Sequence, residues 1–288
     1  MTVEILSHEV CELGEGATFD VTTQTLFWFD ILGKRLYERR LGFGEERVHD
    51  LPFMASALAS IDGDRQLIVA EDGLYVRERV AGRLMRRQEL EAGKPGNRSN
   101  DARTHPCGAF WIGTMGKQAE AKAGAIYWYF AGEVKRLFAD ITIPNGICFS
   151  PDGRVAYFAD SAANRMMRVA CDPKTGLPEG EPAVFIETDR VGGFDGSVCD
   201  GDGEIWNARW GAGALDCYGP NGTLVRSVTL PVSQPSCPAF CGIGLGNLAV
   251  TTARENMSEE LRAAESDAGK TFMVELGLRG RAEPSVTL

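Results

Sequence analysis

The feature of this sequence that most constrains its fold is a repeated pair of short β-type segments. In each repeat, a run rich in Leu, Ile, Val, Phe and Trp is followed by a loop and a second β-type run. The first runs begin near Leu26, Leu67, Phe110, Val155, Ile205 and Leu248. Successive starts lie 41, 43, 45, 50 and 43 residues apart. A period in the forties that is built from strands and not from helices is typical of β-propeller blades.

Six repeats in 288 residues leave about 48 residues for each, enough for four short strands and their turns. A further strand expected at 3–6 would complete the last blade and close the ring. The sequence therefore predicts an all-β, six-bladed β-propeller as one domain over residues 1–288. Two stacked β-sandwiches are the alternative, but they would not explain why an aromatic side chain recurs at one position of the repeat. The recurring aromatics are Trp28, Trp111, Phe158 and Trp206.

Residues that favour turns separate the β-type runs of the repeats. The chain holds 34 glycines, about 12%, against a typical share of roughly 7%. They follow no three-residue period, and many stand in turn dipeptides such as Asp152–Gly153 and Asn221–Gly222. One helix is expected, over 256–268, with Asn256 as its N-cap and Glu259 at the capping-box spacing.

The charge of the chain limits its partners. With 30 basic and 40 acidic residues, the net charge is −10, and no basic cluster exceeds two adjacent arginines. Nucleic acids and anionic membrane surfaces are therefore not expected as partners. No apolar run approaches the roughly 18 residues of a membrane-spanning helix, and residues 1–10 do not resemble a signal peptide. We expect a soluble, cytoplasmic monomer or small homo-oligomer that acts on a small molecule.

The cysteines and histidines do not form a recognisable motif. No CxxC occurs among the eight cysteines, so we expect them to be buried small hydrophobic residues. The three histidines are scattered, and we expect each at the surface or at the edge of the core. A nucleophile elbow, an H-E-x-x-H pair and a phosphate-binding loop are likewise missing from the sequence.

Polar residues interrupt the apolar pattern at matching positions of four repeats, shortly before a β-run. They are Glu15, the group Arg98, Asn100 and Asp101, then Asn145, and Asp195. Matching positions in a propeller converge at one end of its central channel. Two carboxylates and an amide oxygen at that point would form a site for Ca²⁺, Mg²⁺ or Mn²⁺, and Zn²⁺ could be accommodated. Alternatively, Asn145–Gly146 and Asp195–Gly196 are only turn dipeptides.

The ordered motifs around these residues resemble the senescence marker protein/gluconolactonase family. They are GEGATFD, NRSNDARTHPCGAFWIGTM, IPNGICFSPDGRVAYFADS and FDGSVCDGDGEIWNARWGAG, followed by LPVSQPSCPAFCG and VTTAR. The family includes luciferin-regenerating enzyme and many bacterial sugar lactonases, and the likeness covers nearly the whole chain. It implies a six-bladed propeller that binds one divalent cation and hydrolyses lactones, commonly aldonolactones.

The resemblance also implies roles for individual residues. Glu15, Asn145 and Asp195 correspond to the metal ligands, and Asp195 also corresponds to the catalytic acid/base. Arg98 and Asn100 correspond to residues that contact the substrate, and Asn100 is a further metal ligand in some members. Vertebrate members carry a glutamate where Gln118 stands here, which removes a carboxylate contact to sugar hydroxyls.

Two other functions stay open at this point. One is a non-catalytic propeller that binds partners on its faces, and the other is a metal-dependent phosphotriesterase. We expect substrate choice to depend on the loops at 116–124, 188–193 and 210–214. The sequence favours a metal-dependent hydrolase that opens the ring of a sugar lactone, with Asp195 moving a proton between water and the ring oxygen.

Overall fold

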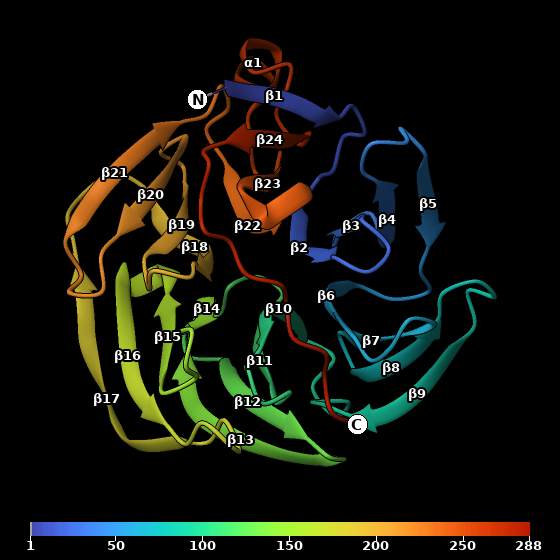
Figure 1. Cartoon of the computed structure of the whole chain (residues 1–288), viewed down its shortest axis with the longest axis vertical. Coiled ribbons are helices and arrows are strands. Elements are labelled where there is room, and N and C mark those ends of the chain that lie inside the picture. Colours follow the sequence, from blue (N-terminus) through green and yellow to red (C-terminus); the bar gives the residue numbers. More distant parts are fainter. Residues whose placement is uncertain (1) are drawn as a thin grey trace.

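In the computed structural model, which describes residues 2–288, six four-stranded antiparallel sheets surround a central axis (Figure 1). The first three sheets are β2 (Gly14–Asp20), β3 (Thr25–Asp30), β4 (Arg35–Arg40) and β5 (Glu46–Asp50); β6 (Ala55–Ser60), β7 (Arg65–Ala70), β8 (Gly73–Glu78) and β9 (Leu84–Glu89); and β10 (Asn97–Thr104), β11 (Phe110–Gly116), β12 (Gly124–Phe130) and β13 (Glu133–Ile141). The next three are β14 (Pro144–Phe149), β15 (Val155–Asp160), β16 (Arg165–Cys171) and β17 (Pro178–Glu187); β18 (Gly193–Cys199), β19 (Ile205–Trp210), β20 (Ala214–Tyr218) and β21 (Leu224–Thr229); and β22 (Pro235–Cys241), β23 (Asn247–Thr252), β24 (Thr271–Glu275) and β1 (Thr2–Ser7). The arrangement confirms the six-bladed β-propeller and excludes stacked sandwiches.

The sixth blade contains strands from both ends of the chain. Its outermost strand, β1, pairs antiparallel with β24, so that Val3 faces Val274 and Ile5 faces Phe272. The remaining strands of this blade come from the C-terminal part of the sequence. Because backbone hydrogen bonds join the two ends of the chain within one sheet, the ring closes without an exposed gap between its first and last blades.

The apolar runs that define the repeat are the second and third strands of each blade. The recurring aromatics lie in second strands, where Trp28, Trp111, Phe158 and Trp206 are buried. Buried apolar side chains form six clusters, and each cluster joins two neighbouring blades. In one of them, for example, Leu67 of the second blade packs with Phe110 of the third. The core is therefore distributed between the blades, and the axis is left to polar residues.

The helix is shorter than predicted and begins later. Helix α1 spans Glu259–Ala264, and its N-cap is Ser258, whose hydroxyl accepts a hydrogen bond from the Leu261 backbone N–H at 3.2 Å. The predicted cap, Asn256, has a left-handed backbone with φ of 58° and lies outside the helix. The prediction of the cap was wrong because an N-cap residue needs an extended backbone, which Ser258 has and Asn256 does not. Two short 3₁₀ turns, η1 (Ser161–Ala163) and η2 (Ile243–Leu245), complete the elements.

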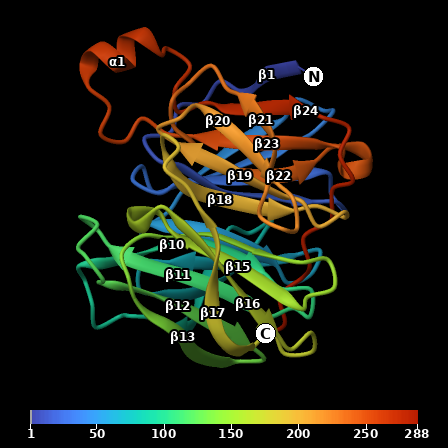
Figure 2. The same ribbon diagram turned by 90° about the vertical axis from the view of Figure 1, so that its left-hand side faces the viewer.

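The innermost strands β2, β6, β10, β14, β18 and β22 define two ends of the ring. We call the end at which they begin the site end and the end at which they finish the tail end. The C-terminal segment 276–288, here called the tail, crosses the centre of the ring in front of the blades in Figure 1. Figure 2 shows α1 and the tail on opposite sides of the ring. The two ends of the axis are therefore structurally different.

The cysteines are free; seven are buried and Cys107 is partly buried, which confirms their expected role as small core residues.

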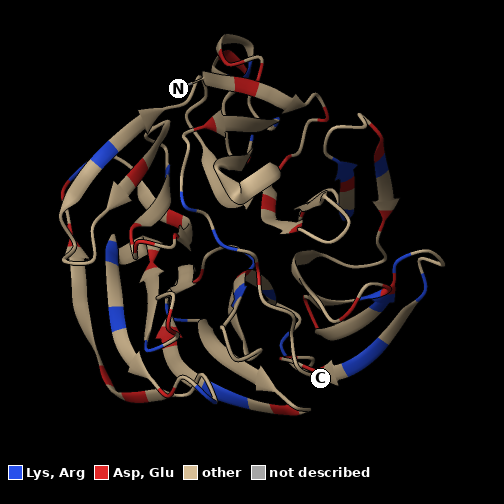
Figure 3. Cartoon of the chain, viewed as in Figure 1, with Lys and Arg blue, Asp and Glu red and all other residues tan. Residues whose placement is uncertain are grey.

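The expectation for His105 was wrong. It is fully buried, and its Nε2 lies 2.8 Å from the carbonyl oxygen of Gly153. Its ring thereby joins the turn between β10 and β11 to the turn between β14 and β15 of the next blade. Elsewhere, Figure 3 shows basic and acidic segments interspersed along the outer strands. Among residues 2–288, no helix has the length and apolar character needed to cross a membrane.

Candidate metal centre and active site

A change of register near the start of each innermost strand positions the predicted site residues. Pairing with the second strand shifts between Glu15 and Thr18, between Ser99 and Ala102, between Asn145 and Cys148, and between Phe194 and Ser197. The two remaining innermost strands shift at Ala55–Ala57 and at Pro235–Pro238. Such bulges bend a strand and redirect its side chains. The polar segments are therefore strands in their own right, and not loops ahead of strands.

Two glycines make the bulges of the first and fourth blades feasible. Gly16 has φ of 61° and Gly146 has φ of 64°, a region that other L-residues rarely adopt. A Cβ atom at Gly16 would also collide with the backbone carbonyl oxygen of Ser56. Each glycine directly follows a predicted metal ligand, Glu15 or Asn145. Close approach of the backbones thus brings ligands from separate blades to one place.

The five predicted site residues are all buried at the site end, with exposed fractions of 4–6%. A chain of hydrogen bonds joins three of them. Arg98 Nη1 donates to Asn100 Oδ1 at 2.7 Å, and Asn100 Nδ2 donates to Asn145 Oδ1 at 2.8 Å. The carboxyl groups of Glu15 and Asp195 lie close enough to influence each other's pKa. The fold therefore brings together side chains that are up to 180 residues apart in sequence.

The two carboxyl groups lie in an environment that opposes negative charge. Burial, together with the neighbouring charge of Asp101, raises the pKa of Glu15 to about 8. Burial and the charge of Glu15 raise the pKa of Asp195 well above its usual range. Moreover, Asp195 Oδ1 is buried and has no hydrogen-bond partner among the described residues. A buried, unpartnered carboxyl oxygen beside a second carboxyl group indicates a place for a cation.

Asp101 is a third buried carboxyl group near this pair. Its Oδ2 accepts a hydrogen bond from the Ile147 backbone N–H at 2.7 Å, and it thereby ties the third blade to the bulge of the fourth. Burial raises the pKa of Asp101, while the positive charge of Arg103 opposes the shift. Sequence reasoning noted Asp101 within NRSND but assigned it no separate role.

The donor set fits a hard divalent cation. Glu15 and Asp195 could provide carboxylate oxygens and Asn145 an amide oxygen, and Asn100 Nδ2 donates to that amide oxygen. Oxygen donors of this kind suit Ca²⁺, Mg²⁺ or Mn²⁺. Within residues 2–288, no group of three or more His, Cys, Asp or Glu side chains has metal-binding geometry.

Two polar residues that sequence reasoning missed hold the backbone around Asp195. Asn207 Nδ2 donates to the Asp195 carbonyl oxygen at 2.6 Å, and Ser161 Oγ donates to the Phe194 carbonyl oxygen at 2.5 Å. Ser161 also accepts a hydrogen bond from Asn145 Nδ2 at 2.8 Å. Asn207 could have been noticed as a polar residue inside the apolar run EIWNARW. Ser161, at the start of the 3₁₀ turn η1, carries no comparable signal.

Gln118 lies outside this hydrogen-bonded group. It is exposed, just beyond β11, and its backbone N–H donates to the Glu120 carboxylate at 3.0 Å. The glutamine that departs from the family pattern therefore belongs to the loop at 116–124, which we expected to influence substrate choice.

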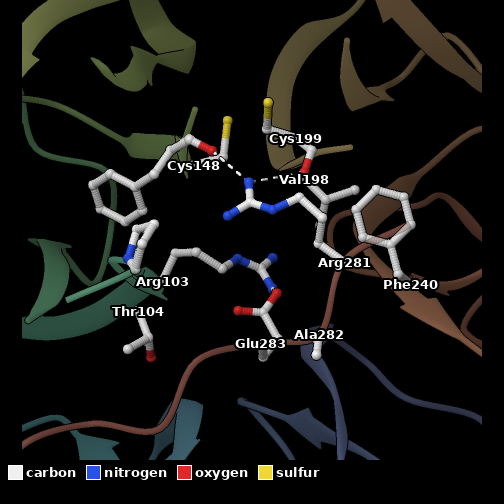
Figure 4. A pocket seen from close by; sticks show the side chains of 11 residues that line it. Arg103, Thr104, Cys148, Val198, Cys199, Phe240, Arg281, Ala282 and Glu283 are labelled. Carbon is white, nitrogen blue, oxygen red and sulfur yellow. Dashed lines mark hydrogen bonds and ion pairs between the residues drawn. The ribbon is translucent and has the colours of Figure 1, made fainter. Parts of the chain in front are cut away.

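The tail covers the other end of the axis and leaves only a small cavity there (Figure 4). The cavity measures about 30 Å³ and is bordered by Arg103, Arg281 and Glu283. Arg103 Nη1 and Glu283 Oε1 form an ion pair at 2.8 Å, and Arg281 Nη1 donates to the Phe149 carbonyl oxygen at 3.1 Å. Small-molecule sites usually occupy hundreds of Å³. The tail-end cavity is therefore too small for a sugar lactone.

Relatives of the chain are sugar lactonases. A Rhizobium meliloti (strain 1021) protein with the name "Putative sugar lactone lactonase" is 51% identical over 284 residues, covering 98% of this chain and 96% of the relative. The L-arabinolactonase of Azospirillum brasilense is 34% identical over 282 residues, covering 94% and 90%.

Solved structures share the fold of the chain, and a family model matches most of its length. A calcium-binding protein, regucalcin, from Agrobacterium tumefaciens is 49% identical, with a TM-score of 0.98 over 100% of this chain and 98% of that one. A luciferin-regenerating enzyme, 24% identical, shares the fold with a TM-score of 0.93, covering 100% and 99% of the two chains. The model of the SMP-30/Gluconolactonase/LRE-like region matches residues 13–254. The chain, with its six blades and its buried carboxyl pair, therefore belongs to the SMP-30/gluconolactonase/LRE-like family.

Proposed function

We propose that this protein is a metal-dependent lactonase that hydrolyses an aldonolactone. The observation that carries the proposal is the buried pair of Glu15 and Asp195 beside the Asn145 amide at the site end. Relatives that include an L-arabinolactonase support a sugar lactone as the substrate. The names of the relatives and the chemistry of the site therefore both support a lactonase.

Glu15, Asn145 and Asp195 would hold one divalent cation, with Asn100 as a further neighbour. Calcium is the first candidate because the similar Agrobacterium protein is calcium-binding, and Mg²⁺, Mn²⁺ and Zn²⁺ are the others. When bound, the cation would supply Lewis-acid stabilisation of negative charge on the lactone oxygen.

Asp195 would act as the acid/base. Its carboxylate accepts a proton from the water molecule whose oxygen forms a bond to the lactone carbonyl carbon. As the bond from that carbon to the ring oxygen breaks, Asp195 returns the proton to the ring oxygen, and the product is an open-chain hydroxy acid. Asp195 Oδ1 has no hydrogen-bond partner among the described residues, so it is free of protein contacts for either of the two proposed roles, cation ligand or proton acceptor.

Arg98 and Asn100 would bind and orient the substrate. The Arg98 guanidinium is buried close enough to Glu15 and Asp195 to feel their charge, and its Nη1 holds Asn100. A fixed guanidinium and a fixed amide can hold sugar hydroxyls and the carbonyl group in a reactive geometry. The five residues together then provide a cation site, a base and substrate contacts.

The test is a panel of aldonolactones read by pH change, with wild-type protein and the variants Asp195→Asn and Asp152→Asn. Asp152 lies in an exposed turn and serves as the matched control. We expect Asp195→Asn to lose about 10²–10⁴-fold in kcat while remaining folded. A chelator should abolish wild-type turnover, and added Ca²⁺ should restore it.

Four results would contradict the proposal. Full activity after exhaustive chelation would refute the need for a metal, and full activity of Asp195→Asn would refute the assigned base. Turnover of phosphotriesters with no turnover of any lactone would assign the site to the phosphotriesterase alternative. Wild-type protein that binds no divalent cation and hydrolyses neither substrate would favour a non-catalytic propeller.

A further inference from the structure

Arg209 is a buried arginine of β19 that neither the proposed cation site nor the proposed chemistry uses. It has an exposed fraction of 1% and pairs across the sheet with Phe194, the residue before Asp195. Its Nη2 lies near three successive backbone carbonyl oxygens, those of Arg190 at 3.3 Å, Val191 at 3.4 Å and Gly192 at 2.6 Å. One guanidinium thus binds three carbonyl groups of the loop that leads directly into β18 and Asp195.

The same guanidinium also contacts the residues on either side of this loop. Its central carbon lies 4.3 Å from the Phe194 ring centroid, a cation–π distance. Its Nη1 donates to Asn164 Oδ1 at 3.4 Å, and Asn164 Nδ2 donates to the Thr188 carbonyl oxygen at 3.0 Å. The loop at 188–192 is therefore held at its beginning, along its length and at its junction with the strand.

A buried carboxylate balances the charge of Arg209. Asp216 is fully buried, and its Oδ2 lies 3.9 Å from Arg209 Nε and 3.4 Å from Nε of Arg190, with which Arg209 shares it. Ser227 Oγ donates to Asp216 Oδ1 at 2.6 Å, and the Tyr218 hydroxyl donates to Oδ2 at 3.1 Å. The fifth blade therefore keeps its guanidinium charged and fixed in place without exposing it to solvent.

The arrangement of the carbonyl groups shows what Arg209 contributes. Three successive carbonyl oxygens that face one point would repel one another unless a cation lies between them. The planar guanidinium can meet several of them at once, whereas the ammonium group of lysine is a compact charge with a different geometry. Beyond the loop, Ser161 and Asn207 hold the carbonyl groups of Phe194 and Asp195. Arg209 thus holds the backbone of the loop that precedes Asp195, and Ser161 and Asn207 hold the backbone at Phe194 and Asp195.

We propose that Arg209 is a positioning residue, which fixes the loop at 188–193 and thereby sets the orientation of Asp195 for catalysis and cation binding. This inference rests on the proposed lactonase function for its catalytic part. Groups that orient a metal ligand or a catalytic side chain typically change affinity or activity about 10–100-fold when they are replaced.

The experiment compares Arg209→Lys with Arg77→Lys. Arg77 is a matched control, because it is equally buried, lies in β8 of the second blade, and donates to Gln66 Oε1 at 2.7 Å. For each variant, kcat, KM, the Kd for Ca²⁺ by calorimetry, and the Tm are measured. We expect both variants to lose thermal stability. We expect only Arg209→Lys to lose about 10–100-fold in kcat and to bind Ca²⁺ more weakly.

A second variant avoids the risk that Arg209→Lys fails to fold. Asn164 has a left-handed backbone with φ of 49°, so Asn164→Gly keeps a favourable backbone and removes only the side chain that joins Arg209 to Thr188. We expect a smaller loss of kcat at an almost unchanged Tm.

The inference is overturned if the Arg209 and Asn164 variants keep wild-type kcat and wild-type Ca²⁺ affinity, whatever their Tm. It is also overturned if Arg77→Lys loses as much kcat as Arg209→Lys, since the effect would then follow from stability alone. Wild-type protein without lactonase activity would instead refute the proposed function, and the Ca²⁺ affinities would still test the positioning of Asp195.

Discussion

The ion pair between Arg103 and Glu283 offers a sharp test of how the tail closes the ring. The substitution Glu283→Gln keeps the size of the side chain and removes its charge. It leaves the Arg103 guanidinium, whose side chain is 7% exposed, without its carboxylate partner. The remaining acceptors are weaker, since Arg103 Nη2 lies 3.3 Å from the Ser197 carbonyl oxygen and 3.5 Å from that of Pro238.

The size of the effect follows from burial. Removing one partner of a buried ion pair costs about 3–5 kcal/mol, and we take the lower end because Glu283 is 19% exposed. Unfolding entropy of about 2.1 cal/mol/K per residue over 288 residues amounts to about 600 cal/mol/K. A loss of about 3 kcal/mol should therefore lower the Tm by about 5 °C.

The assay is thermal unfolding followed by circular dichroism or calorimetry, with Asp202→Asn as the matched control. Asp202 pairs with Arg279 of the same tail, but the two side chains are 52% and 75% exposed. An exposed pair contributes about 0–1 kcal/mol, so the control should lower the Tm by less than about 2 °C. Equal shifts for the two variants would refute the reasoning, because burial would then have no influence on the cost.

Two further predictions concern backbone geometry and pH. Gly16→Ala should destabilise the protein much more than Gly42→Ala. Both positions have positive φ, but only at Gly16 would the new Cβ collide with a neighbouring backbone. Equal losses in the free energy of unfolding would contradict the role of close packing. Burial lowers the pKa of His105 despite the Gly153 carbonyl and Asp172, and Arg281 lowers it further. As the pH falls, His105 is therefore protonated in the unfolded chain before it is protonated in the folded one. The stability that its neutral form contributes is complete above about pH 6.5 and is lost as the pH falls toward the lower folded-state pKa. Measured unfolding free energies between pH 7.5 and 5.5 should fall less steeply for His105→Gln, and parallel slopes would contradict the assignment.

Much of the fold could be predicted because a propeller repeats one local pattern. The spacing from Leu26 to Leu67 and onward reports the size of a blade, and alternating apolar runs report its strands. The end of the helix could not be located as well. Ser258 and Asn256 are both suitable caps by residue type, and the left-handed backbone of Asn256 became apparent only in the folded chain.

The candidate site shows the same division. Glu15, Asn145 and Asp195 stand beside glycines at matching positions of their repeats, so a local signal marked them. Ser161, Asn207 and Arg209 support those residues through hydrogen bonds to backbone carbonyl groups. A backbone acceptor exists at every residue, so no pattern of side chains in the sequence identifies which acceptor will be used.

The sequence by itself determined the number of blades, the residue types around the axis and the resemblance to a family of lactonases. These depend on local periodicity and on short motifs, which can be recognised without knowing the tertiary contacts. The tertiary structure decided which residues meet: Glu15 with Asp195, Arg209 with the loop before Asp195, and Glu283 of the tail with Arg103. Such contacts arise when the ring closes, because closure brings distant segments to one axis and removes the solvent that would otherwise screen their charges.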